Sequence, residues 1–144
     1  MTKVKLLLFS INMFFIWPIM AQDGEEILGE WVTSDGTAKL EIEKEKDSFF
    51  ARVVWLANPN ENGAPKLDHQ NADRSLRQRP ILGLKIIKSL QYKDGKWVDG
   101  ELYDPESGET YSCQLKLDDK GVLEVRGYLG MPVFGRSVFW NRAK

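Results

Sequence analysis

Residues 111–117 read YSCQLKL, and this stretch decides the fold class. Apolar side chains occupy its odd positions and polar side chains its even positions, which is the two-residue period of a β-strand with one buried face. The same period recurs in residues 38–43 and 122–127. Strand-forming residues are also concentrated in 49–56, 83–90, 96–103 and 137–142. The sequence therefore predicts an all-β fold.

Short turn sequences separate these runs. Asp and Gly recur in them, at 34–36, 93–96, 104–108 and 118–121. Such pairs favour tight turns between neighbouring antiparallel strands. About eight strands joined in this way predict a single antiparallel meander that closes into a barrel or half-barrel. Closure would bring Trp31 beside the C-terminal strand.

The first 21 residues are typical of a secretory signal peptide. Lys3 and Lys5 precede an apolar run that ends in the small residue Ala21. This run is shorter than the roughly 20 residues that cross a bilayer, although an uncleaved N-terminal anchor is the alternative. We expect cleavage after Ala21 and export of residues 22–144 to the periplasm or the extracellular space. No transmembrane segment is expected once the signal peptide is removed.

Composition limits what the exported chain can do. Removing 21 of the 144 residues leaves 123, enough for one domain with its own core. The remaining 18 basic and 21 acidic side chains give a formal charge of −3, which argues against nucleic-acid binding. Cys113 is the sole cysteine and lies on the apolar side of its strand, so we expect a buried, unreactive thiol and no internal disulfide.

Residue types suited to catalysis are scarce. His69 is the single histidine, and the surrounding 68–73 segment departs from the oxygen-ligand pattern of a calcium loop. The G-x-S-x-G sequence of a hydrolase nucleophile does not occur either. We therefore predict no catalytic residues, no metal site and no cofactor, and a protein that is not an enzyme.

A long polar segment, residues 57–80, breaks the pattern of tight turns. Loops beyond about 15 residues are uncommon in small domains and are often functional. A short helix within it is expected to begin at Asn71 as N-cap and to end before Pro80. Asp68 and Asn71 are expected to be buried and to shape the segment by hydrogen bonding.

Three arginines follow on the same segment: Arg74, Arg77 and Arg79. The guanidinium group matches carboxylate and phosphate oxygens, so a small anionic ligand could bind there. The alternative is a solvated loop whose arginines are balanced by nearby acidic residues.

Several short pieces follow one another along the chain: Gly29-Glu30-Trp31, Arg52-Val53-Val54-Trp55-Leu56, Asp68 with Asn71, Arg79-Pro80-Ile81-Leu82-Gly83-Leu84, Tyr103-Asp104-Pro105 with Gly108 and Tyr111, Arg126-Gly127-Tyr128, and Gly135-Arg136 before Trp140. Taken in order, they resemble the bacterial family called domain of unknown function 2147 (DUF2147). The resemblance covers nearly all of residues 22–144. It implies a small exported protein and indicates no particular activity.

A looser similarity is to lipocalin-like (calycin) barrels. Those barrels begin with Gly-x-Trp, and an arginine near the C-terminus covers the tryptophan ring and seals the barrel floor by a cation–π contact. In this sequence Trp31 would be the ring, and both Arg136 and Arg142 are candidates for the arginine.

Two functions remain open for the domain. In the first, the open end of the barrel binds a small apolar or amphiphilic molecule, and a cavity above roughly 300 Å³ would favour this reading. In the second, a solid barrel serves as an envelope module that binds another protein. The predicted ligand-binding residues are Trp55, Asp68, Asn71, Arg74, Arg77, Arg79, Tyr103, Arg126, Tyr128 and Arg136. Any such site is expected where the 57–80 segment covers the open end.

Overall fold

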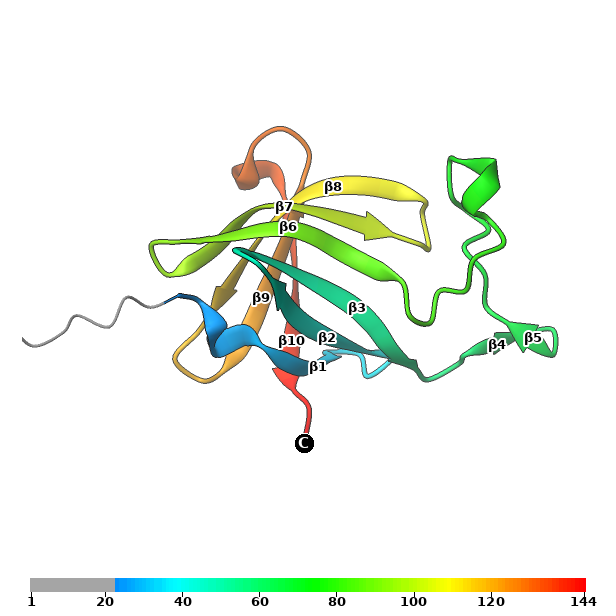
Figure 1. Ribbon diagram of the computed structural model, residues 1–144, viewed down its shortest axis with the longest axis horizontal. Helices are drawn as coiled ribbons and strands as arrows, with labels where there is room; N and C mark the ends of the chain where they lie inside the picture. The colour runs from blue at the N-terminus through cyan, green and yellow to red at the C-terminus, as the bar shows by residue number, and fades with distance from the viewer. Residues whose placement is uncertain (1–22) are drawn as a thin grey trace, which may run out of the picture.

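A computed structural model of the protein describes residues 23–144. The predicted signal peptide and its cleavage site lie outside the described residues. Within residues 23–144, eight antiparallel strands form a closed barrel in the order β1-β10-β9-β8-β7-β6-β3-β2 (Figure 1). The strands are β1 (Gly29–Thr33), β2 (Ala38–Glu45), β3 (Ser48–Leu56), β6 (Lys85–Lys93), β7 (Lys96–Asp104), β8 (Glu109–Leu117), β9 (Val122–Tyr128) and β10 (Arg136–Arg142). The predicted all-β meander is confirmed.

The barrel closes between its first and last strands. Trp31 pairs with Arg142, and Thr33 pairs with Trp140, in antiparallel register. Every other pair of neighbouring strands is also consecutive along the chain. This includes β3 and β6, which pair despite the long connection between them. Trp31 therefore lies beside the C-terminal strand, as predicted.

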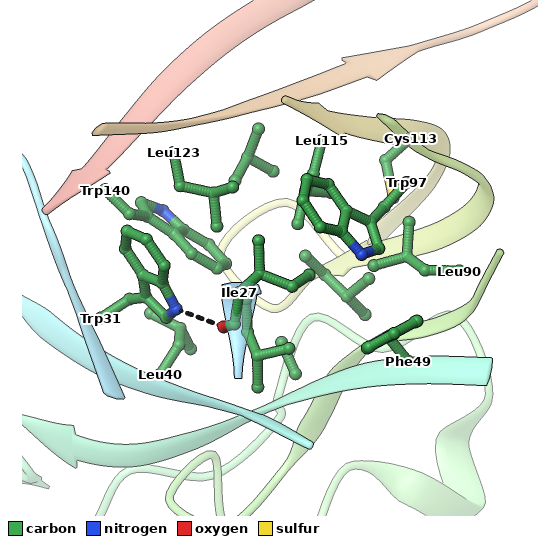
Figure 2. Packing of buried hydrophobic residues seen from close by; sticks show 14 of the residues in the cluster. Ile27, Trp31, Leu40, Phe49, Leu90, Trp97, Cys113, Leu115, Leu123 and Trp140 are labelled. Carbon is green, nitrogen blue, oxygen red and sulfur yellow. Dashed lines mark hydrogen bonds between the residues drawn. The ribbon is translucent and has the colours of Figure 1, made fainter. Parts of the chain in front are cut away.

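One end of the barrel, here called the closed end, is plugged by the 3-10 helix η1 (Glu25–Ile27). The Trp31 indole donates to the Ile27 carbonyl at 2.8 Å (Figure 2), and the Trp97 indole donates to the Gly24 carbonyl at 3.0 Å. Ile27 is fully buried beneath them. The plug satisfies both indole N–H groups, which would otherwise lie unpaired in the core.

Arg142 holds this plug from outside. Its guanidinium lies 4.1 Å from the centroid of the Trp31 ring. It also donates to the Leu28 and Glu26 carbonyls, each at 2.6 Å. Of the two candidate arginines, Arg142 therefore covers the tryptophan.

Inward-facing side chains from all eight strands fill the closed half of the barrel (Figure 2). Cys113 is fully buried among them, and burial raises the pKa of its thiol to about 12. The predicted burial of this thiol is confirmed, and its lack of reactivity stays a prediction. Gly100 leaves room for this packing, since a Cβ atom there would lie 2.5 Å from Leu90 and 2.6 Å from the Cys113 sulfur.

Four connections meet at the opposite, open end. They are the β1–β2 turn, the β7–β8 turn, the β9–β10 loop with η3 (Pro132–Phe134), and the long connection between β3 and β6. The long connection extends away from the barrel and carries β4 (Asn60–Glu61), β5 (Ala64–Pro65) and η2 (Arg74–Leu76) (Figure 1). It packs against the β7–β8 turn so closely that a Cβ atom on Gly108 would lie 2.0 Å from the Gln70 carbonyl oxygen.

The helix in the long connection begins later than predicted. Asp73, and not Asn71, is the N-cap of η2, because its carboxylate accepts from the Ser75 amide at 2.9 Å. The Asn71 side chain instead accepts from the Asp73 amide at 2.9 Å and so shapes the turn before the helix. Asn and Asp are both favourable N-cap residues, and Asp73 takes this position because the helix begins only at Arg74.

Candidate ligand-binding site

A cavity of about 730 Å³ lies at the open end. Its walls come from β6 to β10 and from the β9–β10 loop, because inward-facing positions on these strands continue past the filled core. This volume lies well within the range of small-molecule pockets. The lining residues are Ile86, Leu102, Tyr103, Asp104, Pro105, Tyr111, Val125, Gly127, Tyr128, Leu129, Phe134, Gly135, Arg136, Val138 and Trp140.

The body of the cavity is apolar. Val125 and Trp140, which are almost completely buried, belong to both the core and the cavity wall, so the filled half of the barrel forms the cavity floor. Gly127 occupies the next inward position on β9 and lines the cavity, and a Cβ atom there would lie 3.3 Å from the Leu102 side chain. Val138 is half exposed at the mouth, where solvent reaches the cavity.

Polar groups are confined to the rim. Tyr103, Tyr128 and Arg136, three of the predicted ligand residues, line the cavity, together with Tyr111 and Asp104. The Asp104 carboxylate accepts from the Glu106 amide and the Ser107 hydroxyl in its own turn. Arg136 is exposed and has no side-chain partner among residues 23–144. A cavity with an apolar body and one free cation at its rim suits an amphiphilic molecule.

A second, more polar cavity of about 410 Å³ adjoins the first. Both are lined by Ile86, Asp104, Pro105 and Trp140, so they are two parts of one mouth. The second part reaches under the long connection, and its further lining residues are Thr33, Asp35, Thr37, Ala38, Leu40, Val53, Leu56, Asn58, Lys66, Ile81 and Glu106. The base of the long connection thus borders the open end, but its arginines do not line either cavity.

Asp68 ties the long connection to the barrel. Its fully buried carboxylate accepts from the Tyr103 hydroxyl at 2.5 Å, from the Asn71 amide group at 2.8 Å and from the Arg79 guanidinium at 2.8 Å. Two effects raise the pKa of Tyr103 to about 12: burial of its hydroxyl is the larger, and the hydrogen bond to Asp68 is the second. The predicted burial of Asp68 and Asn71 is confirmed, and the cluster positions Tyr103 at the cavity wall.

The sequence left open whether the arginines of the long connection bind an anion or are balanced by acidic residues, and for Arg79 the structure shows the second arrangement. Arg79 is paired with Asp68 and lies 5.6 Å from the Tyr103 ring centroid. Arg77 donates to the Asn71 carbonyl at 2.7 Å. Only Arg74 is exposed on η2 without such a contact among the described residues. Arg77 and Arg79 donate to acceptors within the long connection because this segment folds back on itself.

Two other predicted residues face away from the cavity. A bulge at Val54 of β3, opposite Lys39 and Leu40, places Trp55 on the outer surface, where the Lys39 ammonium lies 5.7 Å from its ring. Arg126 alternates with the inward positions of β9 and donates to the Pro132 carbonyl and the Ser137 hydroxyl. Its role is to hold the β9–β10 loop.

Sequence reasoning missed most of the apolar wall. Ile86, Leu102, Phe134 and Val138 were not among the predicted ligand residues, although they line the cavity. The sequence could have indicated them, because the inward-facing positions nearest the open end of each strand form the walls of any cavity there.

Residues 23–144 offer neither a metal-binding cluster nor a membrane-spanning helix. No group of three or more His, Cys, Asp and Glu residues is placed to hold a metal ion. In the same part of the chain, no helix is long and apolar enough to cross a membrane.

The closed eight-stranded meander, with one end plugged and a cavity at the other, defines a lipocalin-like barrel. The chain belongs to the family described as "Uncharacterized protein conserved in bacteria (DUF2147)", which matches residues 29–142. Neither this family nor the fold indicates an enzyme.

Among solved structures, the chain is similar to one described as "Protein HP1028 from the human pathogen Helicobacter pylori belongs to the lipocalin family". The TM-score is 0.71 at 20% sequence identity, over 82% of this chain and 83% of that one. At this identity the likeness concerns the fold alone. A search of curated proteins found no match.

Proposed function

We propose that this protein, exported to the periplasm or the extracellular space, binds a small amphiphilic molecule in the open-end cavity. The observation that carries the proposal is the cavity of about 730 Å³ with its mostly apolar wall. The alternative, a protein-binding module with a solid barrel, required an interior filled by side chains. Only the closed half is filled in that way.

The lining indicates the chemistry of the ligand. An apolar body would contact Val125 and Trp140, which form the cavity floor, and Val138 at the mouth. An anionic group would pair with Arg136, whose guanidinium has no partner among residues 23–144. Asp104 lies on the same rim, but its oxygens already accept hydrogen bonds within the β7–β8 turn.

Two dyes of nearly the same shape test this assignment. 1-Anilinonaphthalene-8-sulfonate carries an anionic sulfonate, and N-phenyl-1-naphthylamine is the same ring system without it. Both should bind the wild-type protein with increased fluorescence. Arg136→Gln should weaken binding of the sulfonate about fivefold, as expected for an ion pair near the surface, and leave the neutral dye unchanged.

Arg74→Gln is the matched control, because Arg74 is also an exposed, unpaired arginine but lies on η2 outside the cavity. It should change neither affinity. Equal affinities of wild type and Arg136→Gln for the sulfonate would contradict the anionic site. Failure of both dyes to bind folded wild-type protein would contradict the proposed function itself.

Export is tested by N-terminal sequencing of protein recovered from outside the cytoplasm of the bacterium that makes it. The proposal predicts a chain that begins at Gln22. A chain that begins at Met1, or protein confined to the cytoplasm, would contradict it.

A further inference from the structure

The β9–β10 loop exposes an unusual run of apolar side chains. Leu129, Met131, Val133 and Phe134 are between 62% and 79% exposed, and we call residues 129–134 the apolar loop. Scattered exposed apolar residues are ordinary, but a contiguous group of four on one short loop marks an interaction site. The loop stands out from the barrel just before β10 (Figure 1).

The backbone of the apolar loop is firmly held, so its exposed side chains are presented outward. Arg126 donates to the Pro132 carbonyl at 2.7 Å and to the Val133 carbonyl at 3.4 Å. Gly135 packs so tightly that a Cβ atom there would lie 2.6 Å from the Gly127 carbonyl oxygen. These contacts keep the loop against β9, with Met131 and Val133 exposed to solvent.

The chain segment that carries the apolar loop is basic, whereas the whole chain has a small negative charge. The chain has a formal net charge of −1, yet residues 125–144 contain no Asp or Glu. Arg126 and Arg136 flank the loop on β9 and β10. The Arg126 guanidinium holds the loop backbone, but Arg136 has no side-chain partner among residues 23–144. A protruding apolar group beside such an arginine matches an anionic bilayer surface, where the apolar side chains enter the acyl region and the guanidinium remains at the phosphates.

We propose that the apolar loop inserts into the surface of an anionic lipid bilayer and so places the open end of the barrel against the membrane. Leu129 and Phe134 line the cavity as well as the exposed loop, so the apolar surface is continuous from the loop into the cavity. If the cavity binds an amphiphilic ligand, as the proposed function states, this continuous surface gives the ligand a path between bilayer and cavity.

Vesicle binding tests the loop directly. The full chain is mixed with vesicles of phosphatidylcholine containing 30% phosphatidylglycerol, and bound protein is measured by sedimentation. Met131→Ser with Val133→Ser removes two exposed apolar side chains that do not line the cavity. This pair should lower the partition coefficient about tenfold or more, given the free energy of burying such side chains.

The matched control is Leu76→Ser with Leu82→Ser, two exposed leucines of the long connection. The control should bind vesicles as wild type does, and pure phosphatidylcholine should bind wild type more weakly. Equal loss in both double variants, or no loss in the first, would overturn the proposal.

A site-specific probe excludes binding through residues 1–22, which all variants share. Because Cys113 is buried with a raised pKa, a cysteine introduced on the surface can be labelled selectively. A nitrobenzoxadiazole dye on Val133→Cys should shift to shorter wavelength when vesicles are added. The same dye on Asp94→Cys, in the β6–β7 turn at the closed end, should not shift. Shifts at both positions, or at Asp94→Cys alone, would overturn the proposal.

Failure here is distinguishable from failure of the proposed function. Met131→Ser with Val133→Ser should still bind both naphthalene dyes in solution, because neither residue lines the cavity. Dye binding without vesicle binding by the wild type would refute membrane docking and leave the cavity assignment standing. Vesicle binding without dye binding by the wild type would refute the cavity assignment and leave membrane docking standing.

Discussion

Replacing Arg142 by methionine should destabilise the barrel by removing the contact that holds the plug. Methionine keeps an apolar stem of similar length and loses the guanidinium. The cation–π contact with Trp31 contributes about 0.5–1 kcal/mol at an exposed site. The two hydrogen bonds to the Leu28 and Glu26 carbonyls contribute about 1 kcal/mol each. We therefore expect the free energy of unfolding to fall by about 2–3 kcal/mol.

Urea unfolding, followed by tryptophan fluorescence, measures this change. A loss of this size should also lower Tm by roughly 6–15 °C for a domain of this length. Arg142→Lys should cost about half as much, because lysine keeps the charge over the ring but cannot reach both carbonyls as a fork. Arg136→Met, at the open end, is the control and should cost less than about 0.5 kcal/mol. A loss below about 0.5 kcal/mol for Arg142→Met would refute the role of the plug.

Three further predictions concern the interior. Asp68→Asn should lower the free energy of unfolding in urea by about 2–3 kcal/mol, because a buried acceptor of three hydrogen bonds becomes partly a donor. It should also speed proteolysis within residues 57–84, and an unchanged proteolysis rate would contradict the role of Asp68 in holding the long connection to the barrel. Gly100→Ala should cost about 1–3 kcal/mol by overpacking against Leu90 and Cys113, and an unchanged Tm would show spare room. Since burial raises its pKa to about 12, the Cys113 thiol stays protonated at pH 8 and should react with a disulfide reagent only after unfolding. Rapid reaction of the folded protein would contradict this.

The fold could be predicted because its signals are local. Alternation in residues such as 111–117 depends on which face of a strand is buried, and the Asp and Gly turns fix the connections. Barrel closure then followed from the need to cover both sheet edges. The choice between Arg136 and Arg142 could not be made in advance, because it depends on the register between β1 and β10.

The candidate site was harder to predict because it depends on contacts between distant segments. Trp55 was expected at the site, but a single bulge in β3 turns it outward, and bulges leave little trace in composition. Arg79 reads as a free cation in the sequence, and only the folded long connection brings it to Asp68. The apolar wall was missed since its residues look like ordinary core until the barrel is seen to be filled at one end only.

Native mass spectrometry tests the central claim, that the open-end cavity holds a small molecule. The protein is isolated without denaturation from the bacterium that makes it, as wild type, Val138→Trp and Phe139→Trp. Val138 lines the cavity, so an indole there occupies the mouth, while the adjacent Phe139 does not line it. We predict a bound species of a few hundred daltons, as suits a pocket of this size, on wild type and Phe139→Trp and its loss from Val138→Trp. Bare protein in all three forms, or the same species on all three, would contradict the account.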